Sequence, residues 1–317
     1  MNLDETQTSA PVAIIMFNRP ELTRQVAERV AQAKPQAVYL IADGPRPSHP
    51  TDVEACQATR DAVMGIDWPC PVFTNFADEN LGLRRRVSTG LDWLFESVDA
   101  AIILEDDCLA DLSFFPFATE LIERFHDDAR VGLISGNNFL RGAQITDDSY
   151  FFTRDARIWG WATWRRVWQD FSDSGLSRSW SEEEAQKVVS QLGSHQRQRD
   201  LVSDVGHIGQ IDSWALPFVL HSLSRGYLNV VPRVNLVANI GFGADSTHTK
   251  FENFVVDIPA ESIDFPLTHP ADVSDSPEAG RLEERISKRQ WLWFPLRHPI
   301  DFLGRLFRYA RVIASSR

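Results

Sequence analysis

Three consecutive carboxylates, Glu105, Asp106 and Asp107, directly follow the apolar run of residues 100–104. Such a run is typical of a buried strand in a parallel sheet, and open α/β sheets bind ligands at the carboxyl ends of their strands. Crowded like charges repel one another, and more strongly where they are buried. The simplest group to offset the repulsion is a divalent cation, which prefers hard oxygen ligands. The alternative is a solvated acidic turn that begins the next helix.

Two further segments carry polar side chains at expected strand ends. Asp43 follows the apolar residues 37–42 and either binds a nucleotide base or only shapes a turn, because Asp-Gly-Pro is a strong turn signal. Residues 80–82 precede a predicted helix whose first turn carries three arginines. An arginine there could neutralise a diphosphate, and the alternative is a solvated basic helix face.

Strand and helix patterns alternate along the first 135 residues. Apolar spacing predicts strands at 11–17, 37–42, 71–74, 100–105 and 131–135, and helices at 21–33, 52–64, 83–95 and 114–125. Repeated units of this length predict an α/β fold with a mostly parallel, doubly wound sheet and helices on both faces. No Gly-x-Gly-x-x-Gly follows the first strand and no Gly-Lys-Ser/Thr loop occurs, which argues against a Rossmann dehydrogenase and a P-loop enzyme.

Composition narrows the class of protein. The 317 residues, 43% of them apolar, can form one large domain or two small ones. The net charge of -12 argues against nucleic-acid binding, which needs a basic surface. Three scattered cysteines fit a reducing, cytoplasmic compartment. The polar N-terminus does not resemble a signal peptide, and no apolar run approaches eighteen residues, so we expect no membrane span.

A series of short motifs lies between residues 11 and 255. They are Ile-Ile-Met-Phe-Asn-Arg-Pro at 14–20, Ile-Ala-Asp-Gly at 41–44, Glu-Asn-Leu-Gly-Leu at 79–83, Leu-Glu-Asp-Asp at 104–107, Asp-Ser-Trp at 212–214 and Asn-Leu-Val-Ala-Asn-Ile-Gly-Phe-Gly at 235–243, leading to Thr-His-Thr at 247–249. In this order they resemble GT-A-type nucleotide-sugar glycosyltransferases, particularly family-2-like bacterial surface-polysaccharide sugar transferases. The Glu-Asp-Asp form also resembles the inverting N-acetylglucosaminyltransferases.

The resemblance implies a metal site at the acidic motif, which is usually written Asp-x-Asp. Asp107 would be a direct ligand of Mn²⁺ or Mg²⁺, and Asp106 or Glu105 would contact the ribose or a metal-bound water. Here Glu105 replaces the usual first Asp. His248 lies where many members of this fold supply a late metal ligand, although a histidine in a polar loop is the alternative.

The resemblance also implies a nucleotide site and a catalytic base. Asp43 matches the position that meets the base. The other cofactor-binding candidates are Phe17, Asn18, Arg19, Asn80 and Arg84. Asp212 is the candidate base, which would take the proton of the acceptor hydroxyl. Its alternative role is to cap the helix that follows it, predicted at 216–223.

The Trp-rich segment 159–168 has two interpretations. Trp164 and Trp168 are four residues apart, so they fit the packing of one helix. Indole rings also stack on the apolar faces of sugars. We expect some of these rings to lie in the core and one or two to line the cleft.

The predicted function is metal-dependent transfer of a sugar, with inversion, from a nucleotide diphosphate donor to a saccharide or lipid-linked saccharide acceptor in surface-polysaccharide synthesis. The resemblance implies a GT-A-like catalytic domain over residues 1–270, with a nucleotide-sugar half at about 11–140 and an acceptor half at about 141–270. One alternative is a sugar-1-phosphate nucleotidyltransferase, which would need a Gly-rich loop where residues 18–21 read Asn-Arg-Pro-Glu. The other is a non-catalytic saccharide-binding or assembly protein on the same fold.

The C-terminal residues 271–317 are predicted to form a basic amphipathic helical tail. Residues 281–317 carry a balance of +6, which leaves -18 for residues 1–280. Apolar residues recur at helical spacing from 300 to 313, with arginines largely on the other side. Such a helix either contacts an anionic membrane, which would place the enzyme peripherally at the inner membrane, or packs on the catalytic domain.

Overall fold

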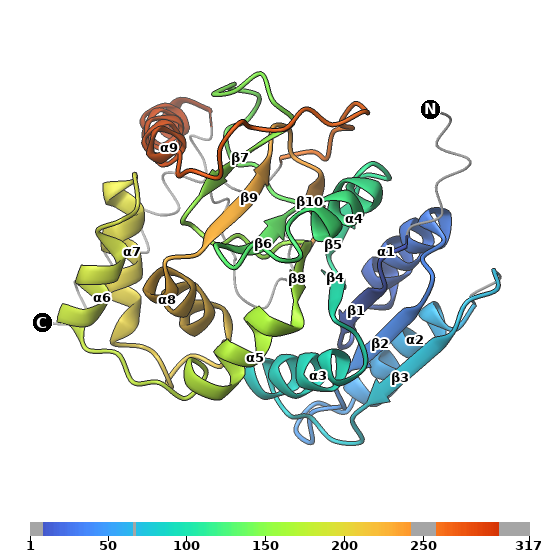
Figure 1. Ribbon diagram of the computed structural model, residues 1–317. Coiled ribbons are helices and arrows are strands. Elements are labelled where there is room, and N and C mark those ends of the chain that lie inside the picture. Colours follow the sequence, from blue (N-terminus) through green and yellow to red (C-terminus); the bar gives the residue numbers. More distant parts are fainter. Residues whose placement is uncertain (1–8, 66–67, 242–257, 298–317) are drawn as a thin grey trace, which may run out of the picture.

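A mixed sheet of eight strands forms the centre of the protein, for which a computed structural model describes residues 9–65, 68–241 and 258–297. Its strand order is β3-β2-β1-β4-β8-β6-β9-β7 (Figure 1). The strands are β1 (Val12–Met16), β2 (Val38–Ala42), β3 (Val72–Phe76), β4 (Ala100–Glu105), β6 (Val131–Ser135), β7 (Tyr150–Thr153), β8 (Trp161–Trp164) and β9 (Leu228–Pro232). A separate pair joins β5 (Cys108–Ala110) to β10 (Val237–Asn239).

The N-terminal half of the sheet is parallel. Strand β1 pairs in parallel with β2 and β4, and β2 pairs in parallel with β3. Strand β8 then runs antiparallel between β4 and β6, while β6 and β9 are again parallel. The predicted mostly parallel sheet is therefore confirmed. Ile15 lies opposite Glu105 and Met16 opposite Ala42, so the three strands β1, β2 and β4 end at one edge.

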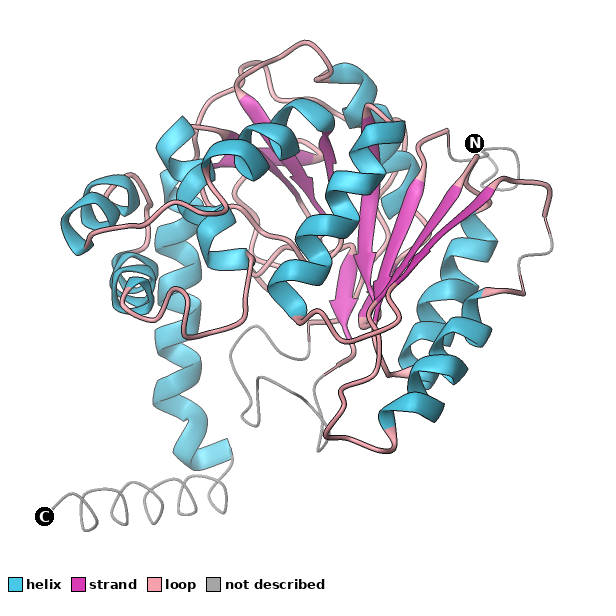
Figure 2. Ribbon diagram, turned by 90° about the horizontal axis from the view of Figure 1, so that it is seen from below, coloured by secondary structure: helices cyan, strands magenta, loops and turns pink. Residues whose placement is uncertain are grey.

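Helices cover both faces of this sheet, as predicted (Figures 1 and 2). Alternate residues of a strand point to opposite faces, so Ile14 packs in one hydrophobic cluster and Ile15 in another. Helices α1 (Pro20–Ala33), α2 (Asp52–Val63) and α4 (Phe114–Arg124) contribute to the first cluster. Helices α3 (Leu83–Ser97), α5 (Arg165–Ser174), α6 (Glu182–Val189), α7 (His195–Val205) and α8 (Ala215–Arg225) contribute to the second. Burial on both faces explains why β1 and β2 are apolar throughout.

The tryptophans at 161, 164 and 168 are core residues, but two of them lie on a strand. Trp161 and Trp164 belong to β8, and α5 begins only at Arg165, so the predicted packing of Trp164 and Trp168 on one helix is wrong. Strand pairing with β4 and β6 decides the conformation of this segment, and four-residue spacing carries no information about such distant partners. All three rings are at most 2% exposed.

The expected tail begins as a helix packed on the body. Helix α9 (Pro277–Arg297) buries Ala279 completely, and its Glu283 forms an ion pair with the buried Arg157. Residues 298–317, including the predicted amphipathic stretch, lie outside the described residues. Among the helices that the structure describes, none combines the length and hydropathy needed to cross a bilayer.

Candidate functional site

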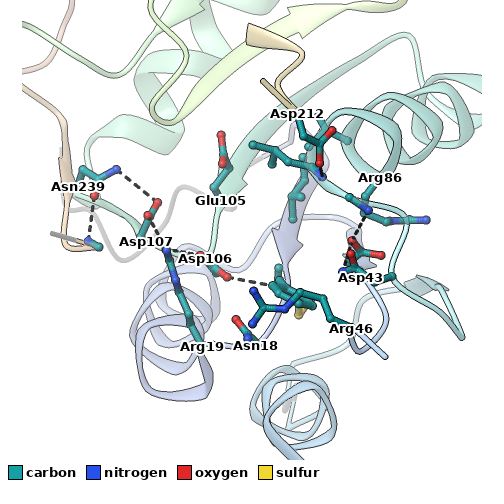
Figure 3. A pocket seen from close by; sticks show the side chains of 18 of the residues that line it. Asn18, Arg19, Asp43, Arg46, Arg86, Glu105, Asp106, Asp107, Asp212 and Asn239 are labelled. Atoms are coloured by element: carbon teal, nitrogen blue, oxygen red, sulfur yellow. Dashed lines mark hydrogen bonds and ion pairs between the residues drawn. The ribbon is translucent and has the colours of Figure 1, made fainter. Parts of the chain in front are cut away.

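A cavity of about 460 Å³ opens at the edge where β1, β2 and β4 end and α3 begins. Figure 3 shows the charged side chains that surround it. Nine of the eleven predicted site residues line it: Phe17, Asn18, Arg19, Asp43, Asn80, Glu105, Asp106, Asp107 and Asp212. The parallel strand ends bring these residues together, although they are spread over almost 200 positions of the sequence.

The acidic motif is a partly buried cluster and not a solvated turn. Asp106 is only 8% exposed, and one of its oxygens accepts a hydrogen bond of 3.2 Å from the backbone N–H of Phe17. Arg19 Nη1 lies 2.9 Å from Asp107 Oδ2 and 3.5 Å from Asp106 Oδ1. The guanidinium therefore offsets part of the repulsion, and binding of a nucleotide by Arg19 stays a prediction.

One guanidinium does not balance three carboxylates. Burial, together with the charges of Asp107 and Asp106, raises the pKa of Glu105 to about 8. Burial and the neighbouring Asp107 also raise the pKa of Asp106 well above its usual range, although Arg19 acts in the opposite direction. The cluster therefore favours a further positive charge.

The oxygen donors of the cluster fit Mn²⁺ or Mg²⁺. Mg²⁺ usually binds through one or two carboxylates together with substrate phosphates, so a complete protein cage is not needed. Within the described ranges no group of three or more His, Cys, Asp and Glu side chains is arranged to hold a metal. Asp107 could instead bind the cation together with phosphate oxygens of a bound ligand. His248, the other predicted ligand, lies outside the described residues.

The end of β10 and the residues after it close one side of the cluster. Asn239 Nδ2 lies 3.4 Å from Asp107 Oδ1, and the N–H of Ile240 donates to the carbonyl of Asp107. A Cβ on Gly241 would lie 2.2 Å from Asp107 Oδ2, so only glycine allows this approach. Residues 239–241 are thus placed beside Asp107.

Asp43 organises the opposite side of the cavity. Each of its oxygens accepts two hydrogen bonds: Oδ1 from the N–H groups of Gly44 and Leu81, and Oδ2 from Asn80 Nδ2 and the N–H of Gly82, at 2.8–3.1 Å. Burial raises the pKa of Asp43, while these backbone donors act against the rise. The carboxylate shapes the turn before α3, and contact with a nucleotide base stays a prediction.

Arg86 lines the cavity, whereas Arg84 does not. Arg84 Nη2 donates to the carbonyl of Leu176, which is not among the residues that line the cavity, and its diphosphate role stays a prediction. Arg86 is 4% exposed, donates to Asn75 and feels the charge of Asp43. Consecutive residues of a helix point about 100° apart, so the three adjacent arginines of α3 face different directions. Arg86, next to the buried Val87, is the one on the side of the helix that lines the cavity.

Asp212 reaches the cavity by capping a distant helix. Its two oxygens accept hydrogen bonds from the backbone N–H groups of Leu83, at 2.7 Å, and Arg84, at 3.0 Å. Gly82 has φ +81°, and a Cβ there would lie 2.5 Å from Asp212 Oδ2. Capping of the helix after Asp212 is therefore not its role, because the carboxylate satisfies the first N–H groups of α3 instead.

Trp159 is the aromatic ring of its segment that faces the cavity. It contacts Phe139 edge-on, with ring centroids 5.5 Å apart. The other tryptophans of the segment are in the core, so the expected division between core and cleft is confirmed. Arg46 lies on the other side, 5.3 Å above the ring of Phe17, and pairs with Asp52.

Comparison with models of protein families and with the sequences of curated proteins gives no match. Among solved structures, a UDP-glucose pyrophosphorylase complexed with UDP-glucose is similar at 10% identity. The similarity covers 53% of this chain and 81% of that chain, with a TM-score of 0.34. A TM-score of this size does not establish a shared fold.

Proposed function

We propose that the protein is a metal-dependent glycosyltransferase that moves a sugar from a nucleotide diphosphate donor to a saccharide hydroxyl, with inversion. The observation that carries the proposal is one cavity that joins the acidic cluster, the Asp43–Arg86 side and Asp212. A cation-binding end, a polar end for a nucleotide and a separate carboxylate are the groups this transfer needs. The wider role, surface-polysaccharide synthesis at the cytoplasmic side of the inner membrane, follows from the motifs and from the basic C-terminus.

The donor would lie across the edge of the sheet at which β1, β2 and β4 end. Its base and ribose would occupy the side lined by Phe17, Asn80 and Arg86, and its diphosphate would face the acidic cluster. There Asp107 and phosphate oxygens would hold Mn²⁺ or Mg²⁺. When bound, the cation supplies charge stabilisation to the departing diphosphate.

Asp212 supplies the base. One of its oxygens takes the proton of the acceptor hydroxyl, the acceptor oxygen bonds to the anomeric carbon, and the electron pair of the broken bond leaves with the nucleoside diphosphate. The N–H groups of Leu83 and Arg84 hold the carboxylate in place for this step. Positioning matters because general-base help of about 10²–10⁴ in rate depends on hydrogen-bond contact with the hydroxyl.

A thermal-shift screen of nucleotide sugars tests the proposal. With Mn²⁺ present, a donor at about a hundred times its dissociation constant adds about 2.7 kcal/mol to the free energy of unfolding. We expect one nucleotide sugar to raise the melting temperature and to be hydrolysed slowly to the nucleoside diphosphate. Pyrophosphate release from a nucleoside triphosphate and a sugar 1-phosphate would instead indicate a nucleotidyltransferase. Binding without any turnover would indicate a non-catalytic saccharide-binding protein.

A further inference from the structure

A second cavity, of about 490 Å³, adjoins the first. Trp159 lines both, and Ser213, which lines the second, follows directly on Asp212, which lines the first. A ligand in the second cavity would therefore have one end beside the proposed base. Helix α7, the segment 155–159 and the start of α8 form most of its wall.

The wall of the second cavity is largely apolar. Ile158, Ile208 and Leu216 line it together with the edge-on rings of Phe139 and Trp159. Pyranose rings have apolar C–H faces, and such faces pack on aromatic and aliphatic side chains. This wall is therefore suited to a sugar ring.

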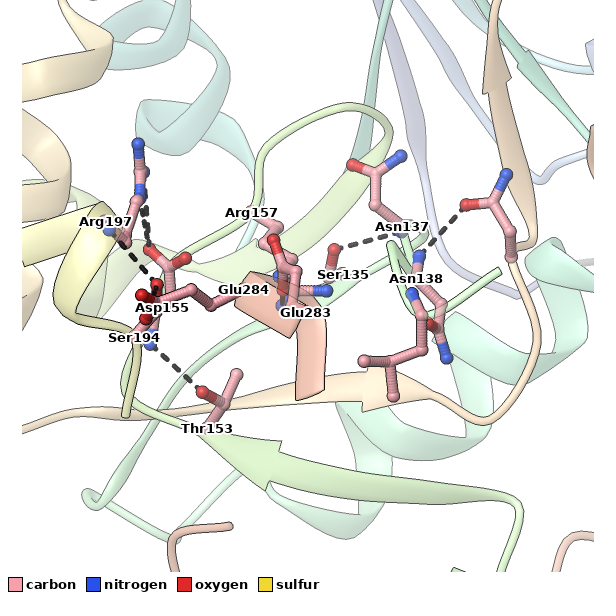
Figure 4. Close-up of polar contacts among 12 residues, drawn as sticks. Ser135, Asn137, Asn138, Thr153, Asp155, Arg157, Ser194, Arg197, Glu283 and Glu284 are labelled. Atoms are coloured by element: carbon pink, nitrogen blue, oxygen red, sulfur yellow. Dashed lines mark hydrogen bonds and ion pairs between the residues drawn. The ribbon is translucent and has the colours of Figure 1, made fainter. Parts of the chain in front are cut away.

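A buried arginine belongs to the wall of the same cavity. Arg157 is 5% exposed, and its Nη2 pairs with Glu283 (Figure 4). Its guanidinium lies 4.8 Å above the ring of Phe139. Its Nε and Nη1 atoms are buried and have no hydrogen-bond partner within the described part of the chain. The guanidinium is thus part of the packed wall, where it supports the ring of Phe139 that lines the cavity.

The charge of the cavity excludes an anion. Four carboxylates line it, from Asp155, Asp200, Asp204 and Glu283, against the two guanidinium groups of Arg157 and Arg197. Arg197 already pairs with Asp155, and Arg157 with Glu283. The remaining carboxylates, Asp200 and Asp204, are exposed on α7 and accept hydrogen bonds from hydroxyl groups well. A phosphate or carboxylate would be repelled, whereas the hydroxyl groups of a neutral polyol donate hydrogen bonds to these acids.

We infer that the second cavity binds the acceptor and that the acceptor is an uncharged saccharide. That the ligand is an acceptor rests on the proposed glycosyl transfer. That it is an uncharged saccharide rests on the cavity itself. The acceptor hydroxyl would pass Trp159 to meet Asp212, where its proton is taken.

Saturation-transfer NMR on the full chain tests this directly. The probes are the uncharged disaccharides cellobiose, maltose and lactose, with glucuronic acid and glucosamine as charged counterparts, each at about 10 mM. Ile208→Trp fills the second cavity. Val53→Trp is the matched control, because Val53 is 61% exposed on α2 and lines neither cavity. The thermal shift with the nucleotide sugar serves as the check that each variant is folded and keeps the first cavity.

We expect at least one uncharged disaccharide to bind the wild-type protein and the Val53→Trp variant, and Ile208→Trp to lose that binding while keeping the nucleotide-dependent shift. Binding that persists in Ile208→Trp would overturn the location. Binding of glucuronic acid alone, of glucosamine alone or of no probe would overturn the ligand class. Disaccharide binding without hydrolysis of any nucleotide sugar would remove the transferase proposal and leave the saccharide site standing.

Discussion

Asp43 is deeply buried and has a full set of hydrogen bonds, as buried polar groups in native proteins usually have. It is 5% exposed, and four donors surround its carboxylate. Three of the donors are backbone N–H groups, which only an acceptor can satisfy. The residue therefore fixes the turn that leads into α3 and with it the edge of the donor cavity.

Asp43→Asn should destabilise the protein because the new amide N–H₂ faces backbone N–H groups. The substitution removes the charged acceptor and leaves buried N–H donors without a partner. We therefore expect a loss of about 2–4 kcal/mol in the free energy of unfolding. Urea unfolding measures this loss. Asp78→Asn is the control, since Asp78 is exposed and should change stability by about 0.5 kcal/mol or less. Equal stabilities of the two variants would contradict the structural role of Asp43.

Single residues were predictable where a strand end placed them. The acidic motif and Asp43 follow apolar runs, Asn80 precedes a predicted helix, and all of them line the cavity. Arg19 and Arg86 were harder, because the partner of a long side chain depends on packing. Arg19 reaches 88 positions along the sequence to Asp107, and the three adjacent arginines of α3 differ only in the face of the helix on which they lie.

Helix α3 depends on a residue that is 129 positions away for its N-terminal cap. Gly82, at its N-cap, has no side chain, and Asp212 accepts from the N–H groups of Leu83 and Arg84 in its place. The contact joins α3 to the segment that precedes α8. Sequence spacing could not reveal this contact, because spacing suggests only that Asp212 caps the helix that directly follows it.

Substitutions at Asp212 should separate capping from catalysis. Asp212→Ala removes both functions and should lower stability by about 1 kcal/mol. Asp212→Asn keeps one acceptor oxygen, so we expect a smaller loss of stability, yet turnover should fall by about 10²–10⁴ because the amide cannot take a proton. Donor affinity should change little. Turnover of Asp212→Asn within a few-fold of wild type would show that the residue is only a cap.

Helix α9 is tied to the N-terminus of α7 by Glu284. The carboxylate accepts hydrogen bonds from Ser194 Oγ, the N–H of Gln196 and Lys288 Nζ. Burial acts to raise the pKa of Glu284, but these donors prevail and lower it to about 2. A lowered pKa means that the ionised form stabilises the folded state above the unfolded pKa of about 4.3 and that this stability is lost as the pH falls toward 2.

Glu284→Gln should therefore cost stability in a pH-dependent way. We expect a loss of about 2–3 kcal/mol at pH 7, shrinking by about 1 kcal/mol at pH 3.5, where the carboxyl of the unfolded chain is largely protonated while that of the folded wild type stays ionised. Urea unfolding at both pH values gives the difference. Glu278→Gln, on an exposed position of the same helix, should show neither the loss nor its pH dependence. A constant difference between Glu284→Gln and wild type across this range would contradict the assignment.

Elements of the first half were predictable, and those of the second half largely were not. The five strands and four helices expected up to residue 135 all occur. Strands β7, β8 and β9 were missed because their pairing is long-range, and β8 enters the sheet between strands that precede it in the chain. Antiparallel insertion has no signature in local apolar spacing.

At the scale of the whole molecule, charge separates the body from the C-terminus. Residues 281–317 carry +6 against -18 for the rest. Because α9 packs on the body, removal of residues 298–317 is a cleaner test of membrane contact than removal of the whole predicted tail. We expect the full chain to sediment with anionic vesicles at low salt and the chain ending at Arg297 to stay in solution, since each basic residue near such a surface contributes about 1 kcal/mol. Equal sedimentation of both chains would remove the membrane proposal.

The central claim is that the acidic cluster and a divalent cation activate a nucleotide-sugar donor. The most direct test measures the release of nucleoside diphosphate from the donor that the thermal-shift screen identifies. Wild type and Asp107→Asn are compared, each with Mn²⁺ and with excess EDTA. We predict a fall of at least about 10²-fold with EDTA and in Asp107→Asn, with a melting temperature close to that of wild type because crowded negative charge is relieved. Full activity in EDTA, or in the variant, would contradict the account.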